Sequence, residues 1–106
     1  MSQSPDRLET LRQMVENRPG DPRFHFGLAV ELLNRGEIRE GAQALKAYLD
    51  LAEDEGNGWG RLGGALADLG EVEEAREAYS RGIEIAARRG HSGLAEELQE
   101  ALEGLS

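Results

Sequence analysis

The glycines of one short segment are spaced as they are in nucleotide-binding loops. Gly58-x-Gly60-x-x-Gly63 matches a dinucleotide fingerprint, in which the backbone approaches a pyrophosphate at the start of a helix. That chemistry requires a β-strand before the glycines and a βαβ unit around them. The residues before Gly58 instead predict a helix followed by a loop. We therefore interpret these glycines as packing positions and not as a phosphate site.

The two histidines and a few hydroxyl groups are the other candidates for chemistry. His25 and His91 lack the His-x3-His or Cys/His spacing of a zinc site, and the carboxylates form no calcium-loop pattern. Tyr79 and Ser80 have no base at a predictable distance, so neither is expected to act as a nucleophile. The sequence thus predicts no catalytic residue, no metal and no cofactor, and the chain is not expected to be an enzyme. His25 is interpreted as a packing residue.

Composition and charge narrow the classes of partner. The chain has 106 residues, of which 39% are hydrophobic and 31% charged, as in a folded domain. Its net charge is −9, from 21 acidic and 12 basic residues, and Lys46 is the only lysine. Nucleic acids and anionic lipid surfaces attract positively charged proteins. We therefore expect neither nucleic acid nor a membrane as the partner.

The N-terminal segment, the apolar runs and the cysteine content bear on the cellular location of the protein. The segment from Met1 to Leu11 carries acids and lacks the apolar region of a secretory signal. No apolar run approaches the length of about 20 residues that crosses a bilayer. The absence of cysteine excludes disulfides and thiolate metal sites but leaves the redox compartment open. A cytoplasmic location is the default expectation.

Two stretches of the sequence repeat each other 34 residues apart. The segment 36–38 (Gly-Glu-Ile) returns as 70–72 (Gly-Glu-Val). Other residues that recur with this offset are Leu28 and Leu62, Leu32 and Leu66, Ala44 and Ala78, and Ala52 and Ala86. A fixed period of this size is typical of stacked arrays, in which a unit buries its apolar face against its neighbours.

Start and stop signals predict six helices, and no segment alternates as a strand would. Ser4-Pro5 and Asp21-Pro22 each place a capping residue before a proline, which favours a helix start. Gly36, Gly70 and Gly90 are expected to end or turn helices. The predicted helices cover residues 4–18, 22–35, 37–52, 58–69, 71–89 and 92–105.

The second copy of the repeat carries a specific residue pattern. Its large and small residues read Trp59-x2-Leu62-Gly63-x2-Leu66 and then Ala75-x3-Tyr79. This pattern resembles the tetratricopeptide repeat, from which it departs at Leu66, where an aromatic residue is usual. The first copy matches more loosely, because Tyr48 stands where a small residue normally lets two helices cross closely.

The resemblance implies an all-α fold, in which antiparallel helical hairpins stack as a short right-handed solenoid of about six helices. A single domain would span residues 1–106, in a small acidic protein of the kind found in bacteria. It would consist of a solitary N-terminal helix at 4–18, repeats at 22–55 and 56–89, and a capping helix at 91–105.

The resemblance also indicates a binding groove, because the first helix of each repeat lines the concave surface in this family. The groove residues would be Arg23, Phe26, Val30, Leu33 and Asn34 in the first repeat, and Gly60, Arg61, Gly64, Ala67 and Asp68 in the second. The first set supplies an apolar floor and the second a glycine track. Glu96, Glu97 and Glu100 would form an acidic end.

A helical or extended peptide with apolar anchors and a basic flank would fit such a groove. We therefore predict a non-catalytic protein–protein interaction module. Two alternatives remain open for Phe26, Val30 and Leu33. The same apolar face could join two copies into a homodimer or structural assembly unit, or it could only complete the core. Family members that grip a C-terminal carboxylate carry Lys and Asn here, so that mode is not expected.

Overall fold

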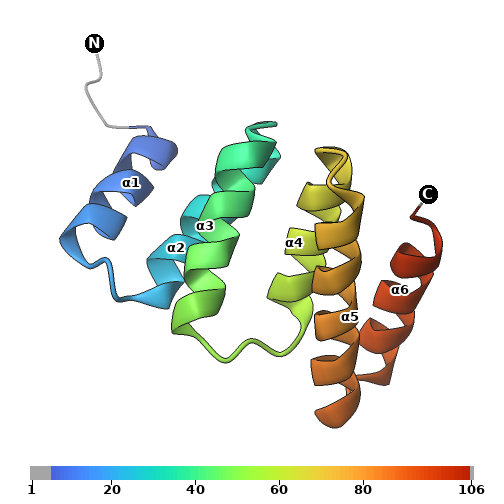
Figure 1. Cartoon of the computed structure of the whole chain (residues 1–106). Helices are drawn as coiled ribbons and strands as arrows, with labels where there is room; N and C mark the ends of the chain where they lie inside the picture. Colours follow the sequence, from blue (N-terminus) through green and yellow to red (C-terminus); the bar gives the residue numbers. More distant parts are fainter. Residues whose placement is uncertain (1–5, 106) are drawn as a thin grey trace. The chain divides into compact units, whose positions relative to one another are not determined.

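The computed structural model describes residues 6–105 and shows an all-α fold, as predicted (Figure 1). The six helices are α1 (Arg7–Asn17), α2 (Pro22–Asn34), α3 (Ile38–Leu51), α4 (Asn57–Asp68), α5 (Val72–Arg88) and α6 (Ser92–Glu103). Turns and short loops join them, and residues 6–105 contain no strand. None of these helices is long and apolar enough to cross a membrane.

The chain divides into two units, Met1–Ala52 and Glu53–Ser106. Unit 1 contains α1, α2 and α3, and unit 2 contains α4, α5 and α6. Within each unit, helices adjacent in sequence pack against each other, and α6 also contacts α4. The pairs α2/α3 and α4/α5 are antiparallel hairpins, one in each unit (Figure 1).

The starts of α1 and α2 follow capping rules. The Asp21 carboxylate accepts the backbone N–H of Arg23 at 3.0 Å and caps α2, as the sequence predicts. α1 begins later than predicted, at Arg7, because Asp6 is its cap and accepts the N–H of Leu8 at 3.1 Å. The cap predicted at Ser4-Pro5 lies outside the described residues.

Three turns between helices share one geometry. The predicted glycines Gly36, Gly70 and Gly90 all have positive φ, at 82°, 78° and 78°. In each turn the next residue donates its N–H to a carbonyl five positions back, which is the bond of a Schellman motif. These bonds are Glu37 to Leu32 (2.9 Å), Glu71 to Leu66 (2.9 Å) and His91 to Ala86 (2.8 Å).

Each unit has its own apolar core. The buried hydrophobic residues of unit 1 are Leu11, Leu28, Ala29, Leu32, Ala42, Ala44 and Leu45. Those of unit 2 are Leu62, Ala65, Leu66, Ala75, Ala78, Tyr79, Ala86 and Leu98. Many are alanines, and small residues let helix backbones come close enough for the larger side chains to fill the remaining space.

A buried carboxylate organises the start of α4. Asp54 is only 8% exposed, although it lies between a predicted helix that ends at residue 52 and one that begins at residue 58. Its Oδ2 accepts the N–H groups of Gly56 at 2.8 Å and Gly58 at 2.7 Å. Gly56 has a φ of 115°, which favours glycine there. The side chain therefore satisfies N–H groups that the first helical turn leaves without backbone partners.

Candidate functional site

The five groove residues predicted in unit 1 all lie on α2. Phe26, Val30 and Leu33 are half-buried, while Arg23 and Asn34, nearer the two ends of the helix, are exposed. We call Phe26, Val30 and Leu33 the α2 face. Their partial exposure leaves apolar surface that another molecule could cover.

Part of the α2 face packs against α3 of the same unit. The Phe26 ring centroid lies 4.9 Å from that of Tyr48, with the ring planes tilted by 58°. This contact accommodates the large residue that the repeat pattern had not led us to expect at position 48. Leu33 packs against Gly41 of α3. A Cβ built on Gly41 would lie only 2.7 Å from Cδ2 of Leu33. Phe26 and Leu33 thus contribute to folding as well as to the exposed surface.

The positive charge of Arg23 is paired with the carboxylate of Asp21, the capping residue of α2. Its Nε lies 3.0 Å from Oδ1 of Asp21, and its Nη2 lies 2.6 Å from Oδ2. The hydrogen bonds from this guanidinium lower the pKa of Asp21 to about 2. The guanidinium carbon also lies 5.6 Å from the Phe24 ring centroid. The N-terminal end of α2 therefore carries an ion pair between Arg23 and Asp21 beside the α2 face.

In unit 2, the predicted glycine track is partly filled by the chain itself. A Cβ built on Gly60 would lie 2.5 Å from Cδ2 of Leu98, so α6 already occupies the space beside Gly60. Gly64 and Ala67 are half-buried, and Arg61 and Asp68 are exposed. The expectation that Gly60 offers an open approach to a ligand is therefore corrected.

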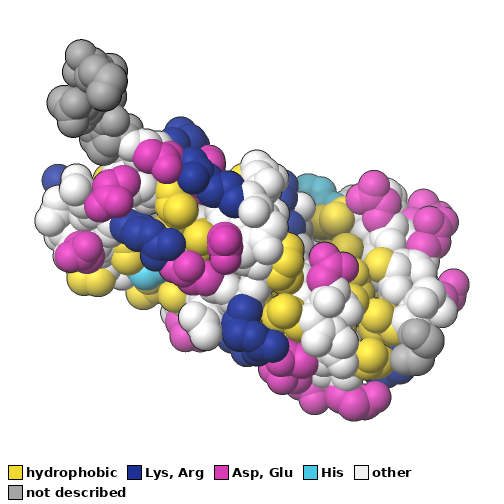
Figure 2. Space-filling model, turned by 90° about the horizontal axis from the view of Figure 1, so that it is seen from above, with side chains coloured by type: hydrophobic (Ala, Val, Ile, Leu, Met, Phe, Trp, Pro, Cys, Tyr) yellow, Lys and Arg dark blue, Asp and Glu magenta, His cyan; other side chains and the backbone are white. Residues whose placement is uncertain are grey.

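The acidic residues are unevenly distributed between the units. Unit 1 has eight acidic and seven basic residues, whereas unit 2 has thirteen acidic and five basic residues. The predicted acidic end, Glu96, Glu97 and Glu100, lies exposed on α6 of unit 2. Acidic side chains are also spread over the surface drawn in Figure 2. Nearly all of the net charge therefore belongs to unit 2.

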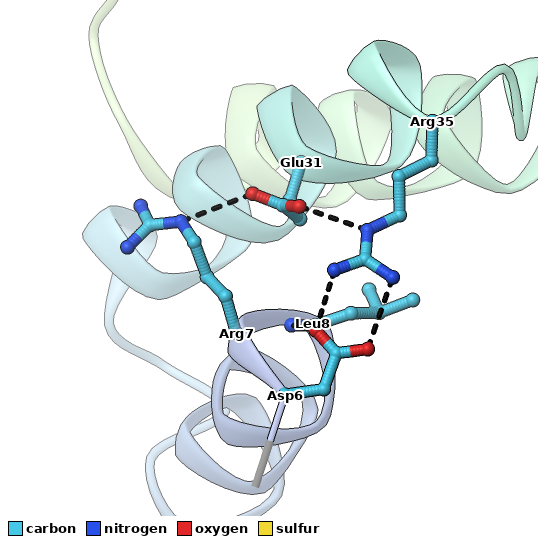
Figure 3. A network of polar contacts seen from close by, with 5 residues as sticks. All are labelled: Asp6, Arg7, Leu8, Glu31 and Arg35. Carbon is cyan, nitrogen blue, oxygen red and sulfur yellow. Dashed lines mark hydrogen bonds and ion pairs between the residues drawn. The ribbon is translucent and has the colours of Figure 1, made fainter.

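Ion pairs fasten α1 to the rest of unit 1 (Figure 3). The Arg35 guanidinium binds both carboxylate oxygens of Asp6, at 3.0 and 2.5 Å, and donates from Nε to Glu31 at 2.8 Å. The other oxygen of Glu31 accepts from Arg7 at 3.0 Å. These contacts form a chain of alternating charges between α1 and α2.

A second bidentate pair joins α1 to α3. Arg12 donates through both terminal nitrogens to the two carboxylate oxygens of Glu40. Near these contacts Leu11 is buried, and its Cδ2 lies 3.1 Å from a Cβ built on Gly27. α1 is thus held by one buried leucine and by two sets of partly exposed ion pairs.

Acidification is expected to loosen α1. Hydrogen bonds from Arg35 lower the pKa of Asp6, and those from Arg12 lower the pKa of Glu40. A carboxylate with a lowered folded-state pKa stabilises the fold above its unfolded pKa, which is about 4, and loses that contribution as pH falls through the folded value. NMR shifts of α1 amides should therefore move toward unfolded values as the pH falls below about 4. The double variant Asp6→Asn, Glu40→Gln should show a weaker pH dependence, and an unchanged one would contradict this explanation.

The histidines have structural surroundings. His25 is half-buried, and its Nε2 lies 2.7 Å from the carbonyl oxygen of Pro19, to which it donates in the matching tautomer. This contact ties α2 to the turn after α1. His91 is exposed, with Nε2 3.5 Å from a carboxylate oxygen of Glu55. Among residues 6–105, no three His, Asp or Glu side chains gather as they would around a metal ion.

The chain is similar to tetratricopeptide repeat proteins in sequence and in structure. No protein-family model matches the sequence. The TPR repeat-containing protein PA0015 of Pseudomonas aeruginosa (strain PAO1) is 26% identical over 91 residues, which cover 86% of this chain and 87% of that protein. The crystal structure of the Sgt2 TPR domain from Aspergillus fumigatus matches with a TM-score of 0.65 and 24% identity, over 93% of this chain and 70% of that chain. The structural likeness shows a shared fold.

Proposed function

Because this chain is a tetratricopeptide repeat protein, we propose that it is a non-catalytic interaction module that binds a peptide or helix of another protein on the α2 face. Domains with this fold are generally protein–protein interaction modules. The cytoplasm remains the proposed location, as the default expectation from the sequence. The contact residues proposed beside the α2 face are Arg23 and Asn34 in unit 1. Those proposed on unit 2 are Arg61, Gly64, Ala67 and Asp68.

The observation that carries this proposal is the two-sided apolar character of α2. One stripe of the helix is buried, with Leu28 at 8% exposure and Ala29 and Leu32 at 0%. The other stripe, the α2 face, is also apolar but only half-buried. A helix that is apolar on both sides is normally covered on both. Binding a partner there would remove the remaining apolar surface from water.

The charge distribution supports a partner with a basic flank. Unit 2 has an excess of eight negative charges, whereas unit 1 is nearly neutral. Charge complementarity accelerates association and discriminates against acidic partners. The proposed partner therefore carries Lys or Arg residues in addition to the apolar anchors for the α2 face.

The test uses Val30→Asp, because Phe26 and Leu33 also hold α3 and their replacement would disturb the fold. Peptides would first be selected on the wild-type chain from a library of short random peptides, and their affinities measured by calorimetry. A carboxylate in the apolar contact should weaken binding by at least about tenfold. Gln43→Asp adds the same charge at an exposed position of α3 and should change affinity by no more than about twofold.

Equal affinities of the Val30→Asp and wild-type chains, with helicity unchanged by circular dichroism, would contradict the proposed site. Light scattering over a range of concentrations addresses the alternative of self-association. A wild-type dimer that Val30→Asp converts to a monomer would assign the α2 face to a second copy of the chain and would overturn the peptide-binding proposal.

A further inference from the structure

Two positions of the repeat carry aromatic residues in the first copy and glycines in the second. Phe26 and Tyr48 precede Gly60 and Gly82 by the repeat offset of 34 residues. In unit 1 the two aromatic rings pack on each other between α2 and α3. In unit 2 both positions are glycine, on α4 and α5. Unit 2 therefore lacks the side chains that fill this space in unit 1.

A leucine from the last helix fills the space instead. Leu98 of α6 is only 7% exposed. Its Cδ2 would lie 2.5 Å from a Cβ on Gly60, and its Cδ1 would lie 2.8 Å from a Cβ on Gly82. Neither glycine could carry a side chain while Leu98 stays in place. We call the space bounded by Gly60 and Gly82 the leucine socket.

The helix that fills the socket is a poor electrostatic match for the unit that holds it. α6 contains four glutamates and no Lys or Arg, and Leu98 is its one buried residue. The remainder of unit 2, without α6, has nine acidic and five basic residues. Like charges repel, although salt screens this effect at the surface. A helix with basic residues in place of the glutamates would suit the same surface better.

We propose that α6 is an autoinhibitory segment and that Leu98 occupies a site for a leucine of the partner. The displacing partner segment is an amphipathic helix that presents one leucine to Gly60 and Gly82 and carries Lys or Arg on its flanks. This inference rests on the proposed function, because it assumes that the chain binds a helical segment of another protein. The charge excess of unit 2 favours the basic helix over the acidic α6.

The probe is a synthetic peptide with the chain's own sequence from 91 to 105, in which the four glutamates are replaced by lysine. A control peptide differs only by Leu98→Ala. Trp59, the only tryptophan, is a natural reporter, since its Cβ lies 3.2 Å from a Cβ built on Gly82. Binding would be followed by the fluorescence of Trp59 in the full chain.

Two variants of the full chain distinguish the effect of Leu98 in the leucine socket from the effect of a charge elsewhere on α6. Leu98→Asp places a charge in the apolar socket and should release α6, whereas Gln99→Asp places the same charge at the exposed neighbouring position. Leu98→Asp should bind the leucine peptide at least about tenfold more tightly than wild type or Gln99→Asp, because a tethered competitor has been removed. The alanine peptide should bind each chain at least about tenfold more weakly than the leucine peptide binds Leu98→Asp.

A second variant places an aromatic side chain in the leucine socket. Gly60→Phe should fill the socket, abolish peptide binding and remove the amide-exchange protection of α6. The helices α4 and α5 should stay protected, because the three atoms nearest a Cβ built on Gly60 all belong to Leu98. Equal binding of the leucine and alanine peptides, equal affinities of the Leu98→Asp and Gln99→Asp chains, or a protected α6 in the Gly60→Phe variant would overturn the proposal. These results concern unit 2 alone, so they are distinguishable from a failure of Val30→Asp to weaken binding at the α2 face.

Discussion

Replacing Leu32 with alanine is expected to lower the free energy of unfolding by about 2–5 kcal/mol. Leu32 lies on the buried stripe of α2 and is 0% exposed. Truncating it removes apolar contacts and leaves a cavity that the surrounding helices fill only in part. Domains of this size have about 5–15 kcal/mol of stability, so the loss is a large share of the total. Urea denaturation followed by circular dichroism measures it.

Leu51→Ala is the matched control for this prediction. Leu51 is the same residue type at the end of α3 but is 44% exposed. Its truncation should cost less than about 1 kcal/mol, since surface changes away from special features usually have small effects. Equal losses for the two variants would show that the buried stripe of α2 has been assigned incorrectly.

Adjacent glycines in α4 should respond in opposite directions to the same substitution. A Cβ on Gly63 would lie 2.8 Å from Cδ1 and Cε1 of the buried Tyr79 ring, which cannot move without disturbing the core of unit 2. Gly63→Ala should therefore lower the free energy of unfolding by about 1–3 kcal/mol. At Gly64 the nearest atom is the Tyr79 hydroxyl oxygen at 3.6 Å, an ordinary contact. Gly64→Ala should raise stability by about 0.5–1 kcal/mol, because alanine favours the helix.

The pair is informative because both variants add one methyl group to the same helix. Thermal unfolding would show a lower melting temperature for Gly63→Ala and a higher one for Gly64→Ala. Two changes of the same sign would be inconsistent with the packing of α4 on Tyr79. Gly64→Ala also probes the contact residues proposed on unit 2, since a ligand backbone that approaches Gly64 closely would bind this variant less tightly.

Local signals explain why the helix boundaries could be predicted from the sequence. Asp21-Pro22 starts α2, and Gly36, Gly70 and Gly90 adopt the positive φ that ends a helix. Each signal acts through neighbours within a few residues, so no tertiary information is needed to read it. The same reasoning failed to predict Asp54, because its role as a buried cap depends on how the loop before α4 folds back.

The sequence did not allow us to predict in the same way which side chains pack against each helix face. A repeat pattern places Gly60 on one side of its helix, but it does not say that Leu98, 38 residues later, lies against it. The packing of Phe26 on Tyr48 likewise depends on the pairing of α2 with α3. A comparison of the repeats would have given a clue, since positions 26 and 48 are both large and positions 60 and 82 are both glycine.

Methyl NMR of the full chain with a library-selected peptide would show most directly where the partner binds. The binding proposal predicts that the largest shift changes occur at the methyl groups of Val30 and Leu33 on the α2 face. Met14 and Leu51 are the exposed large hydrophobic residues elsewhere in residues 6–105 and should change little. Shift changes confined to Met14 or Leu51, with Val30 and Leu33 unaffected, would contradict binding at the α2 face.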